Sequence, residues 1–161
     1  MQKSEGLGDV GKGVSRRVRR PKDKEELFQT LVQDEGIFDI YAHLMTFAAA
    51  LGYFRNRREK FEHSAEPIAW EVFLNAGHES VINAIAAVST GDLEILAYDR
   101  LGDRITVFEE YANGGLLEFQ KELRADRNPL DRIRELLTEA QAQETDGKAP
   151  DIEKMAKDLS W

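Results

Sequence analysis

The chain has 161 residues, of which 42% are apolar and none is cysteine, and its formal net charge is −8. This length suits one domain with tails and allows about two thirds of the unfolded surface to be buried. The lack of cysteine excludes a disulfide scaffold, thiol catalysis and zinc sites built on thiolates. No apolar run reaches the roughly 18 residues of a membrane span, and no signal peptide is recognisable, so we expect a cytoplasmic protein without membrane contact.

Basic residues are concentrated at the N-terminus. Residues 1–22 contain seven Lys and Arg and two Asp and Glu, a net charge of +5, so the remaining 139 residues carry −13. A partner responds to the local charge within a Debye length of roughly 8 Å, and not to the average over the chain. The charge distribution therefore predicts a basic arm joined to an acidic body.

The N-terminal third is predicted to lead from a disordered tail into helices. Residues 1–13 contain four glycines and little that could pack, so we expect disorder there. Residues 14–20 set two valines among arginines, which is typical of a short exposed strand or extended arm. A capped amphipathic helix should follow from Asp23 to near Gly36. A second and more buried helix is predicted over 37–54, where alanines allow a neighbour to approach closely.

The middle of the chain combines helical signals with one ambiguous stretch. Residues 64–75 fit a strand, because apolar residues alternate, and equally a helix that begins at Pro67. A helix is predicted over 78–89, with Gly91 as its left-handed cap. Asp92 should then start a short helix.

The C-terminal part is predicted to form further helices. Helices over 103–112 and 116–123 should be separated by a tight break at residues 113–115, Asn-Gly-Gly. An Asn-Pro pair at residues 128–129 caps another helix, from Leu130 to about Gln141. Residues 142–161 are interpreted as a linker and a short terminal helix.

The predicted fold class is mainly α. We expect a compact, multi-helix single domain over residues 14–141, with a short N-terminal strand and a basic lead-in arm. The order of strand, helix and helix over 14–54 also fits a ribbon–helix–helix unit, in which two chains pair their strands to bind DNA.

Five cations within seven residues are the strongest functional pattern, namely Arg16, Arg17, Arg19, Arg20 and Lys22. Arginine side chains suit phosphate oxygens, so we predict DNA binding here, with a log–log salt slope of about −4 to −5 if all five contact phosphates. A second cluster would extend this DNA-binding surface if the fold brings it alongside, and it consists of Arg55, Arg57, Arg58 and Lys60. If the fold does not do so, the cations of the second cluster complement the dipole at a helix end. The alternative for the first cluster is a solubilising tail or a segment that docks an acidic protein.

No catalytic residue, metal site or cofactor is predicted. Residues 6–12 match the start of a nucleotide-binding loop, but Gly13 replaces its Ser or Thr and no strand precedes it. A metal-dependent nuclease or other DNA-acting enzyme is the alternative if the fold gathers four side chains, His63, Glu66, Glu71 and His78.

Five pieces of the sequence carry a family resemblance over residues 16–123, in the order RRVRRPKDKEELF, LMTFAAALGY, EPIAWEVF, GDLEIL and FEEYANGGL. With these pieces the chain resembles the Dnd system-associated protein 4 family, which accompanies bacterial DNA phosphorothioation operons. AAALGY and FEEYANGGL are the most specific. The resemblance implies a part in phosphorothioate modification or in restriction and antiviral defence, with DNA and other Dnd-system proteins as partners. It carries over no catalytic motif.

We therefore predict a non-catalytic accessory protein that binds DNA, phosphorothioate-modified or not, through its arm and other Dnd-system proteins through its acidic body. A protein-only adaptor is the alternative of another class, beside the nuclease. Glu109, Glu110 and Asn113 are expected to form a partner surface if they face solvent, whereas the same motif needs only a helix end for its structure. The sequence leaves open whether the chain forms a homo-oligomer.

Overall fold

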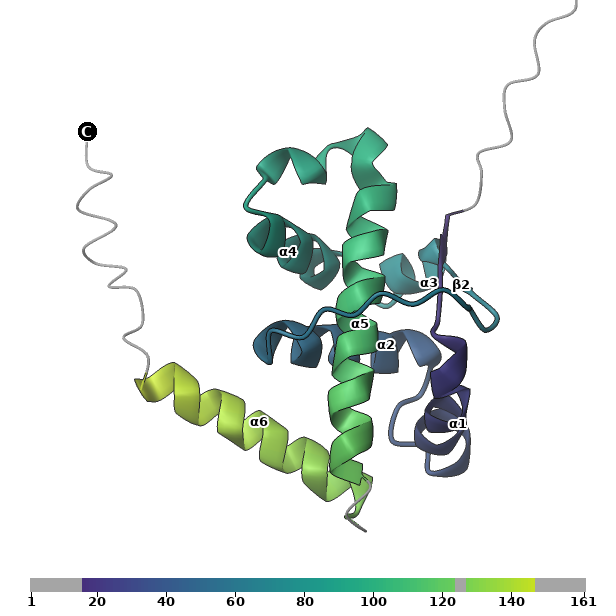
Figure 1. Cartoon of the computed structure of the whole chain (residues 1–161), viewed down its shortest axis with the longest axis vertical. Coiled ribbons are helices and arrows are strands. Elements are labelled where there is room, and N and C mark those ends of the chain that lie inside the picture. Colours follow the sequence, from purple (N-terminus) through teal and green to yellow (C-terminus); the bar gives the residue numbers. More distant parts are fainter. Residues whose placement is uncertain (1–15, 124–126, 147–161) are drawn as a thin grey trace, which may run out of the picture. The chain divides into compact units, whose positions relative to one another are not determined.

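The computed structural model describes residues 16–123 and 127–146, shown in Figure 1. It is mainly helical, as predicted, and it contains a short strand near the N-terminus. The elements are β1 (Arg17–Val18), η1 (Lys22–Lys24), α1 (Glu25–Phe28), η2 (Gln29–Asp34), α2 (Tyr41–Phe54), β2 (Ile68–Ala69), α3 (Trp70–Asn75), α4 (Glu79–Thr90), η3 (Leu93–Leu96), η4 (Tyr98–Arg100), α5 (Leu101–Leu123) and α6 (Pro129–Asp146). Of these, η1, η3 and η4 are 3-10 helices and η2 is a π-helix.

The contacts of the chain separate into two units, Met1–Glu118 and Phe119–Trp161, and the division falls inside α5. The predicted tail over 1–13 and the predicted terminal helix after residue 150 lie outside the described residues. No helix in the described ranges combines the length and the apolar character needed to cross a bilayer.

The basic lead-in, residues 16–22, contributes one strand to a two-stranded antiparallel sheet, and a distant part of the same chain contributes the other. β1 pairs with β2, so that Arg17 lies opposite Ala69 and Val18 opposite Ile68. The ambiguous stretch over 64–75 therefore contains both structures, because β2 is followed directly by α3. Because β1 has its strand partner within the chain, the ribbon–helix–helix interpretation, which needs strands of two chains to pair, is wrong.

The two predicted N-terminal helices are both present, but their boundaries differ from the prediction. The first is a succession of η1, α1 and η2 and ends close to Gly36, as expected. The second begins at Tyr41 and not at Ile37, because Ile40 is extended, with φ −140° and ψ 157°. The backbone N–H groups of Ile37 and Phe38 instead donate to the carbonyl oxygen of Leu31, which folds this loop back onto η2.

α5 runs through residues 113–115 without interruption, so the predicted break there is wrong. Gly115 serves close packing and not a turn: a Cβ atom on it would lie 1.7 Å from the carbonyl oxygen of Ala48 in α2. A Cβ atom on Gly52 of α2 would likewise lie only 2.1 Å from the carbonyl oxygen of Tyr111 in α5. The two helices cross with their backbones in contact, which only glycine permits.

α4 and its surroundings agree with the sequence prediction. Gly91 ends α4 in the left-handed region, at φ +65°, and Asp92 caps η3 by accepting a hydrogen bond from the Glu94 backbone N–H. In the core of the first unit, Phe73 of α3 meets Phe108 of α5 edge to face, with ring centroids 5.5 Å apart.

The second unit contains α6, whose predicted Asn-Pro start is confirmed. Asn128 Oδ1 accepts a hydrogen bond from the Leu130 backbone N–H at 2.9 Å. Arg132, which is buried, forms ion pairs with three carboxylates, those of Glu122, Glu135 and Glu139. α6 continues to Asp146, so the predicted linker begins at least five residues too early.

Candidate functional site

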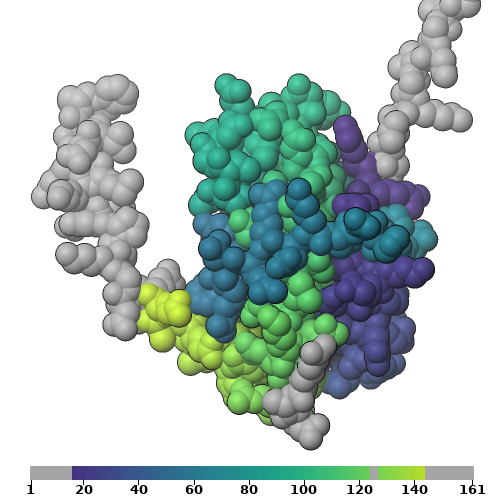
Figure 2. All heavy atoms as spheres, in the orientation of Figure 1, coloured from purple at the N-terminus to yellow at the C-terminus, as the bar shows by residue number. Residues whose placement is uncertain are grey.

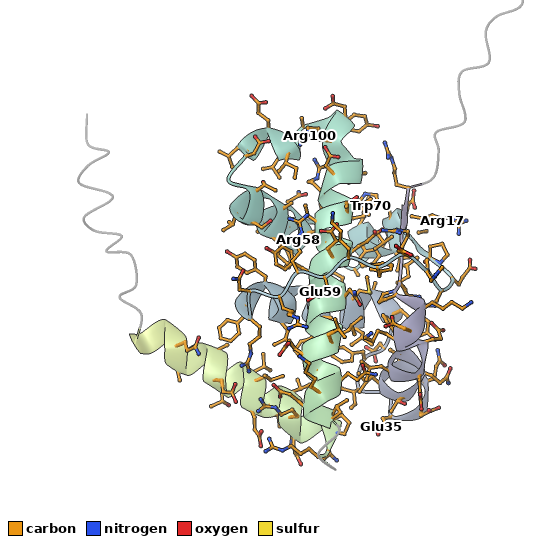
Figure 3. All side chains as sticks on the ribbon, viewed as in Figure 1. Arg17, Glu35, Arg58, Glu59, Trp70 and Arg100 are labelled. Carbon is orange, nitrogen blue, oxygen red and sulfur yellow. The ribbon has the colours of Figure 1, made fainter. Side chains whose placement is uncertain are left out.

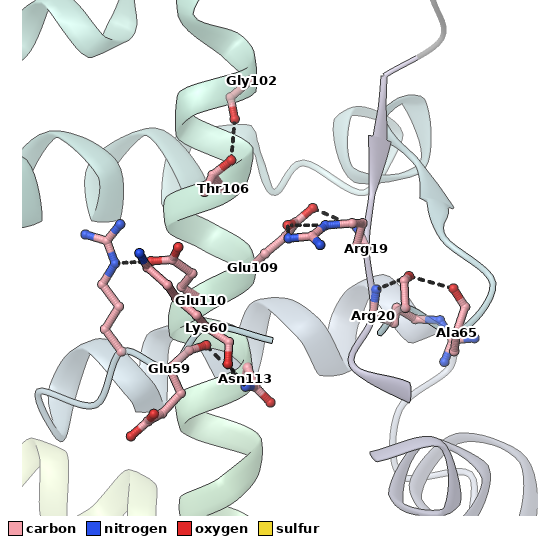
Figure 4. A network of polar contacts seen from close by, with 12 residues as sticks. Arg19, Arg20, Glu59, Lys60, Ala65, Gly102, Thr106, Glu109, Glu110 and Asn113 are labelled. Atoms are coloured by element: carbon pink, nitrogen blue, oxygen red, sulfur yellow. Dashed lines mark hydrogen bonds and ion pairs between the residues drawn. The ribbon is translucent and has the colours of Figure 1, made fainter. Parts of the chain in front are cut away.

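The predicted cationic arm is fastened to α5 through Arg19. Its backbone N–H donates to Glu109 Oε1 at 2.9 Å and its side-chain Nε–H donates to Glu109 Oε2 at 3.0 Å, as Figure 4 shows. The Arg19 guanidinium also lies over the ring of Phe61, 4.7 Å from its centroid. Glu109 is 3% exposed, whereas the Arg19 side chain is 43% exposed. This contact joins residues that are 90 positions apart in the sequence.

The buried position of Glu109 is reflected in its ionisation. Burial raises the pKa of its carboxyl group above the ordinary 4.5, and the charge of Glu110 adds to the rise, while the hydrogen bonds and charge of Arg19 oppose it. The pKa stays raised because half-exposed Arg19 only partly offsets the loss of water. The Arg19–Glu109 contact therefore fixes geometry more than it adds electrostatic stability.

Arg20 is even more completely engaged within the protein, and only 3% of it is exposed. Its Nη1 atom donates to the Glu25 carboxylate at 2.7 Å, and its Nε atom donates to the carbonyl oxygen of Glu66 at 2.9 Å. The guanidinium lies over the rings of Phe28 and Tyr41, at 4.8 and 4.5 Å from their centroids. Arg20 therefore joins the lead-in to α1, α2 and the segment before β2, and the prediction that it contacts DNA is not compatible with its burial.

The second cationic cluster lies on the connection from α2 to β2, residues 55–67, which crosses α5 in Figure 1. The Arg58 Nε–H donates to the Glu110 carboxylate, and Figure 3 shows Arg58 and Glu59 over α5. Asn113 holds the same connection, because its Nδ2 atom donates to the carbonyl oxygens of Glu59 and Lys60 at 3.2 and 3.5 Å. The connection is thus held to α5 by two side chains of the FEEYANGGL motif.

Glu109, Glu110 and Asn113 do not face solvent, so the expected partner surface at these three residues is wrong. They are 3%, 7% and 5% exposed. The physical reason is that two extended segments lie across this part of α5, and backbone polar groups in such segments need partners when they are covered. The motif supplies those partners, with Glu109 for the lead-in and Glu110 and Asn113 for the connection.

The AAALGY piece contributes to the same arrangement. Its Ala48 and Gly52 meet the backbone of α5 at Gly115 and Tyr111, and the rings of Tyr53 and Tyr111 lie edge to face at 5.8 Å. The two most specific pieces of the family resemblance are therefore in contact where α2 and α5 cross, and the polar residues of FEEYANGGL hold the two extended segments.

A cavity of about 450 Å³ lies beside the connection, and Lys24, Phe61 and Asn113 are among the residues that line it. Asn113 Oδ1 is buried and accepts no hydrogen bond from the described residues. Lys24 is also buried, and its Nζ atom pairs with Asp23. The sequence prediction missed this cavity, because its walls come from segments that are distant along the chain.

Six of the predicted DNA-binding cations are exposed, namely Arg16, Arg17, Lys22, Arg55, Arg58 and Lys60, although Arg58 pairs with Glu110. Arg17 lies 3.7 Å from the exposed Glu66 carboxylate, a loose contact. The two segments that carry the clusters meet near their C-terminal ends, because the Lys22 backbone N–H donates to the carbonyl oxygen of His63 at 2.9 Å. Arg57 is half-buried between two carboxylates, 3.0 Å from that of Glu59 and 3.5 Å from that of Glu118.

The four residues of the nuclease alternative are not gathered into a metal site. Within residues 16–123 and 127–146, no three side chains of His, Cys, Asp or Glu are arranged so that they could hold a metal ion. His78 instead meets His43 of α2 edge to face, with ring centroids 5.1 Å apart. Burial lowers the pKa of His78 below its ordinary 6.5, and the charge of His43 lowers it further.

The fold and the site define a small helical protein in which two extended segments are fastened across a long helix by glycine contacts and by ion pairs whose carboxylates are buried. The family model for DNA sulphur modification system-associated protein 4 matches residues 17–155. The chain belongs to this family, which confirms the resemblance seen in the sequence and associates the chain with a DNA sulphur modification system. Neither a curated protein nor a solved structure matches it.

Proposed function

We propose that this chain is a non-catalytic accessory protein of a DNA sulphur modification system, and that it acts by holding another protein of that system. The observation that carries this proposal is the engagement of the predicted DNA-binding cations. Arg19, Arg20 and Arg58 pair with the chain's own carboxylates, so these guanidinium groups hold the fold together. With them engaged, the charge that residues 23–161 present is dominated by carboxylates, which repel phosphates and attract basic protein surfaces.

Family membership supports the biological setting of the proposal. An accessory protein of such a system would serve either the modification of DNA or the restriction of unmodified DNA, which is a form of antiviral defence. In either branch its partners are other Dnd-system proteins, and its own contribution is to position them.

A retention experiment tests this function. The full chain is immobilised and offered, one at a time, the purified other proteins of the system, at low and at physiological salt. We expect it to retain at least one of them with an affinity that weakens as salt increases. Retention of none at either salt concentration would refute the proposal.

DNA binding is the second candidate function, and one observation favours it: Arg16, Arg17 and Lys22 are exposed on the lead-in. Exposed Arg55 and Lys60 lie on the adjoining connection and would extend the same surface. Three phosphate contacts by the lead-in predict a log–log salt slope of about −3, because each contact contributes about −0.9. The slope of −4 to −5 predicted for all five cations would require Arg19 and Arg20 to leave their internal partners.

A matched pair of variants separates the two groups of cations. Replacing Arg16, Arg17 and Lys22 together with Ala should abolish retention on a DNA duplex and leave the melting temperature unchanged. Replacing Arg19 and Arg20 should lower the melting temperature, because both hold the fold. Comparing phosphorothioate-modified with unmodified duplex in the same titration tests sulfur recognition. Unchanged retention by the triple variant would remove this candidate.

A further inference from the structure

The most exposed large apolar side chains gather at one end of the first unit. Among the described residues these are Val88, Leu93 and Tyr98, which are 65%, 75% and 97% exposed. Val81, also exposed, lies two helical turns before Val88 and so on the same face of α4. η3 packs against α4 and η4 against η3, so the elements that carry these residues are neighbours. In Figure 2 the teal-to-green segment from α4 to η4 forms one end of the first unit. We call Val81, Val88, Leu93, Leu96 and Tyr98 the apolar end surface.

The same part of the chain is acidic. Residues 61–99 contain seven Asp and Glu residues and neither Lys nor Arg. Glu79, Glu94 and Asp99 lie on the elements that carry the apolar end surface, and all three are exposed. Exposed apolar side chains that are flanked only by negative charges are typical of a binding surface and not of a surface selected only for solubility.

The elements that carry this surface are held in place from within. Arg100, labelled in Figure 3, pairs with Asp92 at 2.8 Å and with Asp103 at 2.9 Å. Buried Arg104 of α5 donates from Nη1 to two carbonyl oxygens of residues 95–97, at 2.6 and 2.8 Å. The two arginines join η3 and η4 to the start of α5, so the surface exists before a partner arrives and a partner does not pay to order it.

We propose that the apolar end surface docks a segment of another protein in which apolar anchors are flanked by Lys or Arg. The inference rests on the proposed function and names the chemistry of the partner. Burial of the anchors supplies the affinity, and the carboxylates orient the segment and speed its association. Nucleic acid does not fit, because its phosphates would face these carboxylates. A second copy of this chain does not fit either, since a symmetric contact would set the same carboxylates against each other.

The test uses the full chain and a labelled, short amphipathic peptide of leucine and lysine, followed by fluorescence anisotropy. A peptide in which glutamate replaces lysine is the charge control. One variant, Leu93→Ser with Tyr98→Ser, removes two anchoring contacts, and another, Glu94→Lys with Asp99→Lys, reverses the local charge. The matched control variant, Leu130→Ser with Leu137→Ser, removes two exposed leucines from α6.

We expect the wild-type chain to bind the leucine–lysine peptide with an affinity that weakens as salt increases, and to bind the glutamate peptide at least about tenfold more weakly. Both end-surface variants should lose about tenfold or more in affinity, and the α6 control should bind as the wild type does. Equal binding by wild type and the end-surface variants, equal binding of both peptides, or self-association of the chain that the variants abolish would each overturn the proposal.

The same variants separate this inference from the proposed function. If an intact protein of the system is retained equally by the wild type and by both end-surface variants, the docking surface is wrong and the proposed function stands. If no intact protein is retained by the wild type, the proposed function fails and this surface loses its role within it.

Discussion

At the scale of single residues, Glu109 shows how a charged side chain can be structural without being a strong electrostatic contributor. It accepts hydrogen bonds from both the backbone and the side chain of Arg19. Burial nevertheless raises its pKa, which means that its ionised form is less favourable in the folded protein than in water. What the carboxylate secures is the position of the lead-in, because it satisfies a backbone N–H that follows β1 directly.

Replacing Glu109 with Ala should therefore lower the free energy of unfolding by about 2 kcal/mol, since it leaves the Arg19 N–H groups without their acceptor. Glu109→Gln should cost less, because the amide oxygen still accepts from the Arg19 backbone and no buried charge has to be desolvated. Denaturant unfolding at neutral pH measures both.

The exposed Glu26 supplies the control for this pair. Glu26→Ala should change the free energy of unfolding by no more than about 0.5 kcal/mol, as is usual for surface positions. A Gln variant at residue 109 that loses as much as the Ala variant would mean that the charge, and not the hydrogen-bond acceptor, holds the lead-in.

At the scale of elements, the sequence predicts what local chemistry determines. The left-handed cap at Gly91 and the Asn128 cap of α6 were both predicted, because each depends on residues within a few positions of a helix end. The break predicted at Gly114 and Gly115 is wrong because their roles depend on distant segments: Gly115 packs against Ala48 of α2, and Gly114 against the backbone of Arg57 on the connection. A glycine at a crossing and a glycine in a turn look alike in one sequence.

For the candidate site, too, the sequence predicts the features that depend on neighbouring residues and misses those that depend on distant ones. The two cationic clusters were identified from composition, and the segments that carry them meet through Lys22 and His63, while a joint DNA-binding surface stays a prediction. Their partners were not identified, because Arg19 and Glu109 are 90 positions apart and no pattern in one sequence connects them. The apolar end surface also went unnoticed, although residues 61–99, which lack Lys and Arg, carried a visible signal.

The crossing of α2 and α5 leads to a sharp prediction within one helix. Gly115→Ala should destabilise the protein by about 3 kcal/mol or more, because the new Cβ would collide with the Ala48 carbonyl and backbone cannot move aside cheaply. Gly102→Ala, in the same helix, should stabilise it by about 0.5–1 kcal/mol, since only the flexible end of Arg16 is near and alanine favours the helix.

Thermal and denaturant unfolding of both glycine variants provide the measurement. Loss of stability in the two variants alike would indicate that α5 tolerates no alanine for reasons other than contact with α2. A Gly115→Ala variant as stable as the wild type would show that the backbones of α2 and α5 are not in contact.

At the scale of the whole molecule, the uneven charge of the sequence is partly neutralised by folding. The N-terminal excess of positive charge meets carboxylates from α1 and α5, through Arg20 with Glu25 and Arg19 with Glu109. What remains on the outside is a short basic edge at Arg16, Arg17 and Lys22 and an acidic, partly apolar end carried by residues 79–99. This uneven surface charge is what the proposed accessory role would use.

The stability of the whole molecule should also depend on pH through His78. Its pKa is lowered in the folded state by burial and by His43, so below about pH 6.5 the unfolded chain binds a proton more readily than the folded protein does. The free energy of unfolding should therefore decrease as the pH falls from 7.5 to 5.5.

The raised pKa of Glu109 acts in the opposite direction, because it lowers the free energy of unfolding as the pH rises above 4.5. The contribution of His78 is therefore measured as the difference in the free energy of unfolding between the wild type and His78→Gln. That difference should shrink toward acidic pH. A constant difference across this range would show that His78 titrates alike in the folded and unfolded chain.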